Sequence, residues 1–160
     1  MAEIIGFSSI IILGIFTVIL IYFQPRIFPI LILAFIIRIS VMLFGYYVSP
    51  LPESGGDAEV FEQLAWTMSQ GDFSYILSQY PGPDASFISW LIAFFYYFTG
   101  RSILMAQSIS IFFGISSIFL SWVIAKNLFG ERTANKVGYL LALFPTFVLY
   151  STLILRESYA

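Results

Sequence analysis

Long apolar runs alternate with short polar connections along this chain. The apolar runs cover residues 4–23, 27–48, 102–129 and 137–155. Each holds about the 20 residues that a helix needs to cross roughly 30 Å of hydrocarbon. Helices are also the open-chain way to satisfy every backbone polar group in lipid. The pattern therefore predicts an all-α, polytopic membrane protein with about four transmembrane helices.

The four runs form two pairs, separated by a segment of different character. Residues 1–48 are expected to form one transmembrane hairpin and residues 102–160 another, within a single membrane domain. Residues 49–101 are expected to form a long loop with amphipathic or interfacial helices. Composition supports this class of protein, because 59% of the residues are apolar and only 10% are charged, against about 25% charged residues in soluble domains.

The charges are distributed unevenly, and their placement predicts an orientation. Residues 49–101 hold six of the nine acids, namely Glu53, Asp57, Glu59, Glu62, Asp72 and Asp84. The two short connections instead carry Arg26, Arg132 and Lys136. The positive-inside rule then puts the connections in the cytoplasm and the acidic loop outside a bacterial-type inner or plasma membrane. A net charge of -2 without a basic run argues against nucleic acid as a partner.

Residues 86–99 (SFISWLIAFFYYFT) are apolar but only 14 residues long. A run of this length is more typical of a re-entrant or interfacial helix than of a span. Its Trp90, Tyr96 and Tyr97 suit the headgroup region, where amphipathic rings collect. We expect this segment to lie in, or dip into, the outer leaflet.

A helix is expected after the turn at Gly55-Gly56, ending near Gly71. One face of this helix is apolar at helical spacing. Asp57 lies four residues before Phe61 and is therefore expected on the same face, whereas Glu59 and Glu62 are expected to project elsewhere. The residues of the apolar face are Phe61, Leu64, Ala65 and Met68.

Asp57 has two compatible interpretations. Aspartate is among the best N-capping residues, so it is a candidate helix cap. The chain also has no histidine and no cysteine, so acid–base or metal chemistry would fall to carboxylates, which suit Mg²⁺ or Mn²⁺. A carboxylate aimed at the membrane body after a flexible turn is therefore a candidate catalytic group. Solvated or structural roles are expected for the other acids of the loop.

Arg38 lies midway along the second apolar run. A charge at that depth costs several kcal/mol unless it faces a cavity or a partner, and it is a functional candidate by default. No carboxylate lies midway along any of the four runs. Its expected partner is therefore a backbone carbonyl, water, a lipid phosphate or another subunit.

Several short motifs follow one another along the chain. A D-A-x-x-F-x-x-x-A pattern begins at Asp57, and Gly71-Asp72-Phe73 and Tyr80-Pro81-Gly82-Pro83 follow it. Residues 125–138 (AKNLFGERTANKVG) lead to Ala142-Leu143-Phe144-Pro145, Ser151 and Leu155-Arg156-Glu157. In this order, residues 27–160 resemble the GT-C superfamily of multispanning glycosyltransferases, which use polyprenyl-phosphate sugars. The superfamily includes protein O-mannosyltransferases, lipid A aminoarabinose transferases and oligosaccharyltransferases.

The resemblance implies roles for particular residues. Asp57 would be the general base that deprotonates the acceptor, or would hold a metal, Mg²⁺ or Mn²⁺, that does so. Glu157 would be a second ligand or an orienting group, or else a helix-end charge at the interface. Arg101 and Arg156 would clamp a lipid phosphate, or else anchor the chain at the interface. Arg38 is a further candidate for phosphate binding.

The chain also departs from the family pattern. Many members have two adjacent acids in the first loop, whereas Ala58 follows Asp57 here, which favours the base role over metal chelation. Family enzymes have many more spans, so the chain corresponds to the N-terminal part of one. The alternative is a non-catalytic GT-C-like subunit with a structural role in a larger complex. Either interpretation implies membrane lipids and other membrane subunits as partners.

Overall fold

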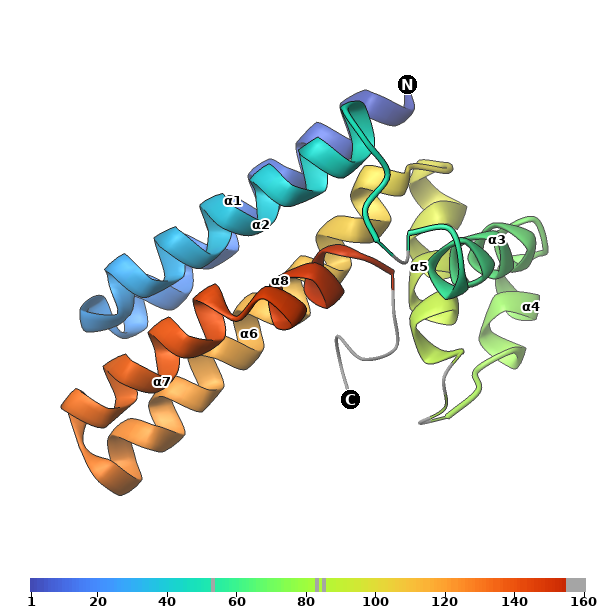
Figure 1. The fold of residues 1–160 in the computed structure, drawn as a ribbon. Coiled ribbons are helices and arrows are strands. Elements are labelled where there is room, and N and C mark those ends of the chain that lie inside the picture. The colour runs from blue at the N-terminus through green and yellow to red at the C-terminus, as the bar shows by residue number, and fades with distance from the viewer. Residues whose placement is uncertain (53, 83, 85, 155–160) are drawn as a thin grey trace.

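The computed structural model describes residues 1–160 except 53, 83, 85 and 155–160. Regular structure in the described residues is entirely helical (Figure 1). The elements in chain order are α1 (Ala2–Phe23), the 3₁₀ turn η1 (Pro25–Ile27), α2 (Phe28–Tyr47), α3 (Asp57–Ser69), α4 (Phe73–Ser78), α5 (Phe87–Thr99), α6 (Ile103–Phe129), α7 (Glu131–Leu143) and α8 (Pro145–Thr152). The predicted all-α class is confirmed.

Three helical segments are long and apolar enough to cross a membrane. They are Ala2–Phe23, Pro25–Tyr47 and Ile103–Phe129, and they match the first three apolar runs of the sequence. This finding indicates a membrane protein. It covers the described residues only, and it does not confirm a fourth span.

The fourth apolar run is divided between two helices, α7 and α8. Phe144 between them has extended backbone angles, φ -64° and ψ 115°. Pro145 explains the break, because proline has no N–H for the helix ladder and pushes the preceding residue towards extended angles. The helix also begins earlier than predicted, at Glu131. The expected single span is therefore a broken helix pair.

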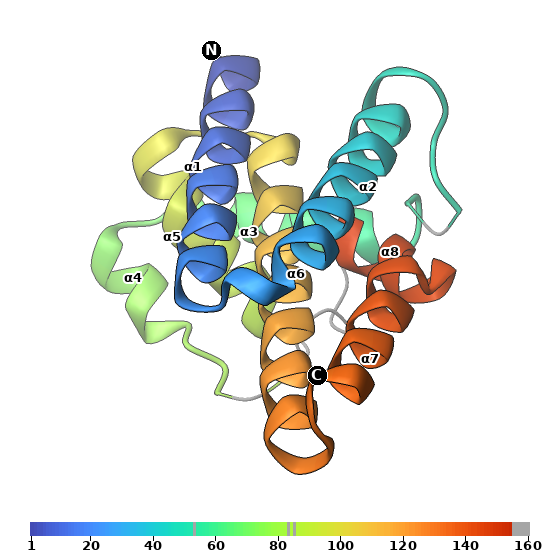
Figure 2. The ribbon, with the colours of Figure 1, turned by 90° about the vertical axis from the view of Figure 1, so that its left-hand side faces the viewer.

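Helix α6 is the central element of the bundle, packing against α1, α2, α7 and α8 (Figure 2). Its buried side includes Ile111, Ile115, Ile118 and Trp122. Gly114 permits a close approach of α6 and α8, since a Cβ there would lie only 2.7 Å from the Cβ of Ser151. This agrees with the small-residue spacing of Ser110 and Gly114, which allows helix backbones to approach closely.

The bases of the two short connections gather at one end of the bundle. Arg26 of η1 forms an ion pair with Glu131 at the start of α7. Lys126 near the end of α6 donates a hydrogen bond to the side chain of Gln24, at 2.8 Å. The two connections are thus held together, as the hairpin arrangement predicts.

The acidic loop contains three helices, α3, α4 and α5, at the other end of the bundle (Figure 1). Helices α3 and α5 pack on each other through a cluster that includes Ala65, Ile88 and Ile92 and extends to Met105 of α6. The first turn of α1 is tied to the same end, because Ser102 donates a hydrogen bond to the carbonyl of Ala2 at 2.9 Å. Helix α5 has 13 residues, as expected for a segment too short to span.

Candidate functional site

Asp57 occupies the first position of α3. The residue in the N-cap position is Gly56, and no side chain caps the helix. The expected capping bond of Asp57 is therefore not formed. Its side chain is exposed, and it has no hydrogen bond or ion pair with any described residue. Among the described residues, no group therefore engages this carboxylate.

The buried side of α3 differs from the apolar face expected from the sequence. Its buried residues are Ala58, Glu62, Ala65 and Ser69. The large apolar residues Phe61, Leu64 and Met68 are only half-buried. The helix is thus rotated, so that small residues pack inward and allow α5 to approach. Asp57 lies outside this stripe, and Glu62, expected to project away from the packed face, lies within it.

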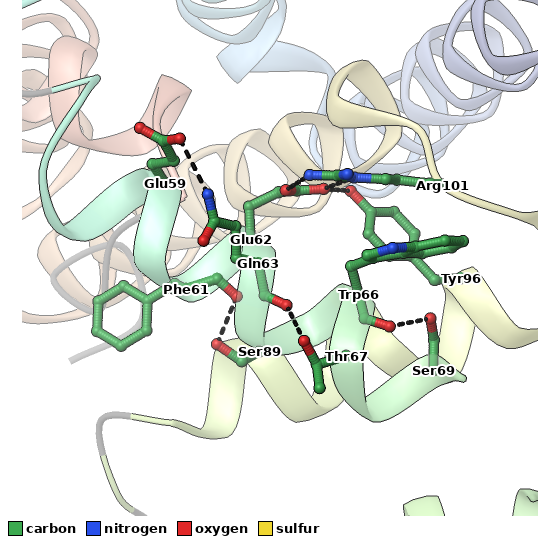
Figure 3. Close-up of polar contacts among 10 residues, drawn as sticks. All are labelled: Glu59, Phe61, Glu62, Gln63, Trp66, Thr67, Ser69, Ser89, Tyr96 and Arg101. Atoms are coloured by element: carbon green, nitrogen blue, oxygen red, sulfur yellow. Dashed lines mark hydrogen bonds and ion pairs between the residues drawn. The ribbon is translucent and has the colours of Figure 1, made fainter. Parts of the chain in front are cut away.

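Glu62 is the centre of a hydrogen-bonded cluster between α3, α5 and the start of α6 (Figure 3). Arg101 donates from Nε to Oε1 at 2.9 Å and from Nη2 to Oε2 at 2.6 Å. Tyr96 donates from its hydroxyl to Oε1 at 2.8 Å. The guanidinium also lies 5.6 Å from the centroid of the Trp66 ring. A buried carboxylate is very costly unless it is paired and hydrogen-bonded in this way.

The pKa values of both side chains that donate to Glu62, Tyr96 and Arg101, are raised. The hydrogen bond with Glu62 raises the pKa of Arg101 above its ordinary value. Burial, and then the hydrogen bond with Glu62, raise the pKa of Tyr96. Both shifts favour the protonated forms that donate to Glu62. The hydrogen bonds of the cluster therefore hold α3 against α5 and the connection to α6.

Arg101 was predicted to clamp a lipid phosphate. In the structure, Nε and Nη2 of Arg101 donate to Glu62. This edge of the guanidinium is therefore not available for bidentate binding of a phosphate. The side chain of Arg101 is 43% exposed, against 6% for Glu62. Its phosphate role stays a prediction.

Arg38 is fully buried within the bundle. Its Nε donates to Ser151 Oγ at 2.9 Å, its Nη1 to the carbonyl of Ala142 at 3.3 Å, and its Nη2 to the carbonyl of Leu141 at 3.3 Å. Its guanidinium carbon also lies 5.2 Å from the ring centroid of Phe147. A backbone carbonyl was among the expected partners, and the structure shows such carbonyls together with the hydroxyl of Ser151, which was not expected.

The break at Pro145 explains these partners. The carbonyl of Leu141 would accept a hydrogen bond from residue 145 in a continuous helix, but proline has no N–H. The last carbonyls of a helix are also unpaired and carry partial negative charge. Arg38 supplies the missing donors together with a compensating positive charge. Its phosphate role stays a prediction.

The remaining candidates, Arg156 and Glu157, lie outside the described residues. The closest described neighbours in sequence are Leu153 and Ile154, which are buried. Leu153 packs with Ala58, the residue after Asp57. In the part of the chain that the structure describes, no three acidic side chains gather in a group that could hold a metal ion.

The Glu62–Arg101 pair was not predicted from the sequence. A signal for it exists in the small residues Ala58, Ala65 and Ser69, whose helical spacing marks a closely packed face with Glu62 on it. Arg101 is also the only base in residues 49–101, so a buried acid in that segment has one local partner. The predicted apolar face is partly correct, because Ala65 is buried and Phe61 and Met68 pack against its cluster, but the buried side also includes Glu62.

Comparison with known proteins identifies no relative, since no protein-family model, no curated protein and no solved structure matches the chain.

Proposed function

We propose that this chain is a module of a membrane glycosyltransferase that uses a polyprenyl-phosphate-linked sugar, with Asp57 as the general base. The observation that carries the proposal is the state of the Asp57 side chain. It is exposed and unpaired among the described residues, at the end of the bundle where the loop helices lie. A general base needs such freedom to come within hydrogen-bond reach of its proton.

The position of Asp57 distinguishes it from the other acids of α3. Asp57 lies in the first turn of the helix, where its side chain is exposed. Glu62, one turn further on, is unsuited because three hydrogen bonds already occupy its oxygens. Glu59, the third acid of α3, accepts a hydrogen bond from Gln63, so Asp57 is the acid of this helix without a partner among the described residues.

The packing of Ala58 with Leu153 also supports the proposal. It brings the start of α3 against the end of the α7–α8 pair, and the sequence continues from there to Arg156 and Glu157. We propose Glu157 as the second acidic group and Arg156 as a phosphate-binding residue of the same site. The acidic loop would face the outside of the membrane, where such a donor is presented.

The test is transfer activity of the protein expressed from its own gene in native membranes, supplied with a polyprenyl-phosphate sugar. Asp57→Asn should lower transfer by about 10²- to 10⁴-fold, the usual contribution of a positioned base. Asp72→Asn is the matched control, because Asp72 is also an exposed aspartate at the start of a loop helix. Equal activity in the two variants would exclude Asp57 as the base.

A non-catalytic subunit is the second candidate function. It is favoured by the commitment of Arg101 and Arg38, two of the predicted phosphate-binding residues, to protein groups. In that case the wild-type protein would show no transfer, and it would instead co-purify with the other subunits of a membrane complex. The same preparation therefore separates the two candidates.

A further inference from the structure

An apolar groove runs along the bundle between α1, α5 and α6, with a volume of about 670 Å³. Helices α1 and α6 lie side by side (Figure 2), and α5 forms the third wall. Large apolar side chains line it from all three helices, including Ile12, Phe16, Phe95 and Phe112. It is separate from Asp57 and from the Glu62 cluster, none of whose members lines it.

Three of the four hydroxyl groups on the walls donate hydrogen bonds to backbone carbonyls. Ser9 donates to the carbonyl of Gly6 at 2.6 Å, Ser108 to that of Leu104 at 2.8 Å, and Thr99 to that of Phe95 at 2.9 Å. Satisfied hydroxyls of this kind offer little to a polar ligand. The groove therefore suits hydrocarbon and not a sugar or a peptide backbone, whose polar groups would lose their hydrogen bonds there.

The length of the groove matches one leaflet of a bilayer. On α1 its lining extends from Ile4 to Phe16, which is about 18 Å at the helical rise of roughly 1.5 Å per residue. Half of the hydrocarbon core is about 15 Å thick. The groove begins beside the first turn of the α1 span and beside Thr99, at the end of the bundle that carries the loop helices.

The lining of the groove suits a flexible chain of hydrocarbon, since apolar side chains form all three walls. Ile4 and Ile12 on the walls are 70% and 66% exposed. Contact of these apolar side chains with water would be unfavourable. A flexible acyl chain covers such a surface without any polar group to satisfy.

We propose that the groove binds one acyl chain of a membrane phospholipid from the leaflet adjoining the loop. The acyl chain fills the space between α5 and the α1–α6 pair, so the short helix α5 packs on the bundle partly through a lipid. The headgroup lies outside the groove, at the level of the connection from Gly100 to Ser102. The site does not depend on glycosyltransferase activity.

The test is the phospholipid retained by the purified protein, counted by native mass spectrometry after reconstitution in phospholipid nanodiscs and transfer to mild detergent. Ser8→Trp fills the groove from α1 and Leu91→Trp fills it from α5, since both residues line it. Ile11→Trp and Phe98→Trp are matched controls on the same helices, because both residues are exposed outside the groove. Helical content by circular dichroism confirms that each variant is folded.

The wild-type protein and both controls should retain one phospholipid per chain, and the two filling variants should lose it. Equal retention in all five proteins would overturn the proposal. A parallel arm adds polyprenyl phosphate to the nanodiscs, and its selective retention in place of phospholipid would also overturn it. So would a dimer that the filling variants abolish, because a second copy of the chain would then occupy the groove.

Discussion

Glu62 and Arg101 differ in how much water reaches them, and this difference determines the cost of breaking the pair. The Glu62 side chain is 6% exposed, so removing its partner would leave a buried charge without compensation. Arg101→Gln should therefore destabilise the loop helices by up to about 3 kcal/mol. Urea unfolding followed by tryptophan fluorescence would measure this, because Trp66 lies against the guanidinium.

The control for this variant is the ion pair between Arg26 and Glu131. Its side chains are 67% and 36% exposed, so Arg26→Gln should cost no more than about 1 kcal/mol. The double variant Glu62→Met with Arg101→Met should recover much of the stability lost in Arg101→Gln, since it leaves no buried charge. If the double variant were the least stable of all, the pair itself would be the stabilising element.

Tyr96 makes the same cluster sensitive to alkaline pH. Folding raises its pKa above the ordinary value of 10.0, so the folded protein holds the phenol proton more tightly than the unfolded chain. The stabilising contribution is complete below pH 10 and declines as the pH rises above it. The raised pKa of Arg101 adds no change there, because an arginine side chain is protonated throughout that range in both the folded and the unfolded chain.

Tyr96→Phe should accordingly lower the stability of the loop helices by about 1 kcal/mol at pH 8, through the lost hydrogen bond to Glu62. The variant should also show a smaller loss of stability than the wild type as the pH rises above 10. Tyr22→Phe, at an 82% exposed tyrosine, should leave the profile of urea midpoints against pH unchanged. A decline in Tyr96→Phe as steep as in the wild type would assign the alkaline effect to another group.

At the level of helices, the break between α7 and α8 and the buried charge of Arg38 should depend on each other. Pro145→Ala supplies an N–H that can pair with the carbonyl of Leu141, so Arg38 is then less needed as a donor. Arg38→Met should be strongly destabilising in the wild-type background and less so beside Pro145→Ala. We expect a coupling energy of about 1–3 kcal/mol from the double-mutant cycle.

Unfolding in mixed micelles of increasing SDS content would measure this coupling. Pro29→Ala is the control, because Pro29 lies in the first turn of α2, where a missing N–H costs nothing. Additive effects of Arg38→Met and Pro145→Ala would mean that Arg38 does not compensate for the helix break.

The two helix pairs show what the sequence could and could not predict. The spans α1, α2 and α6 were predictable because length and apolar character decide them. Pro145 divides the last run and frees carbonyls of α7, and their pairing with Arg38 of α2 is a tertiary effect. The face of α3 was misread for a related reason: Ala58 and Ala65 pack inward by being small, while larger neighbours remain half-buried.

Asp57 shows the same limit at the candidate site. The sequence placed it correctly at the start of a helix in the loop, but could not show that Glu62 would be buried and Asp57 left exposed. That outcome depends on the rotation of α3 against α5, which Arg101 and Tyr96 fix from outside the helix. Pairing between distant segments is not encoded in local periodicity.

Across the whole molecule, charge is separated between the two ends of the bundle. Lys126 and the Arg26–Glu131 pair lie at the connections, and the acidic loop lies at the start of α1 and α6. The bundle thus has the polarity that the positive-inside rule requires. The outer location of the loop is a prediction of that rule, and it is open to a direct test.

The chain has no cysteine, so single cysteines introduced at exposed positions can report sidedness without background. Gln79→Cys lies in the loop after α4, and Asn127→Cys lies in the last turn of α6; both positions are exposed. A membrane-impermeant maleimide added to intact cells should label Gln79→Cys, and should label Asn127→Cys only after the membrane is permeabilised. The reverse pattern would place Asp57 in the cytoplasm and remove the basis for an external glycosyl transfer site. Labelling of both cysteines in intact cells would mean that the bundle does not cross the membrane as the positive-inside rule predicts.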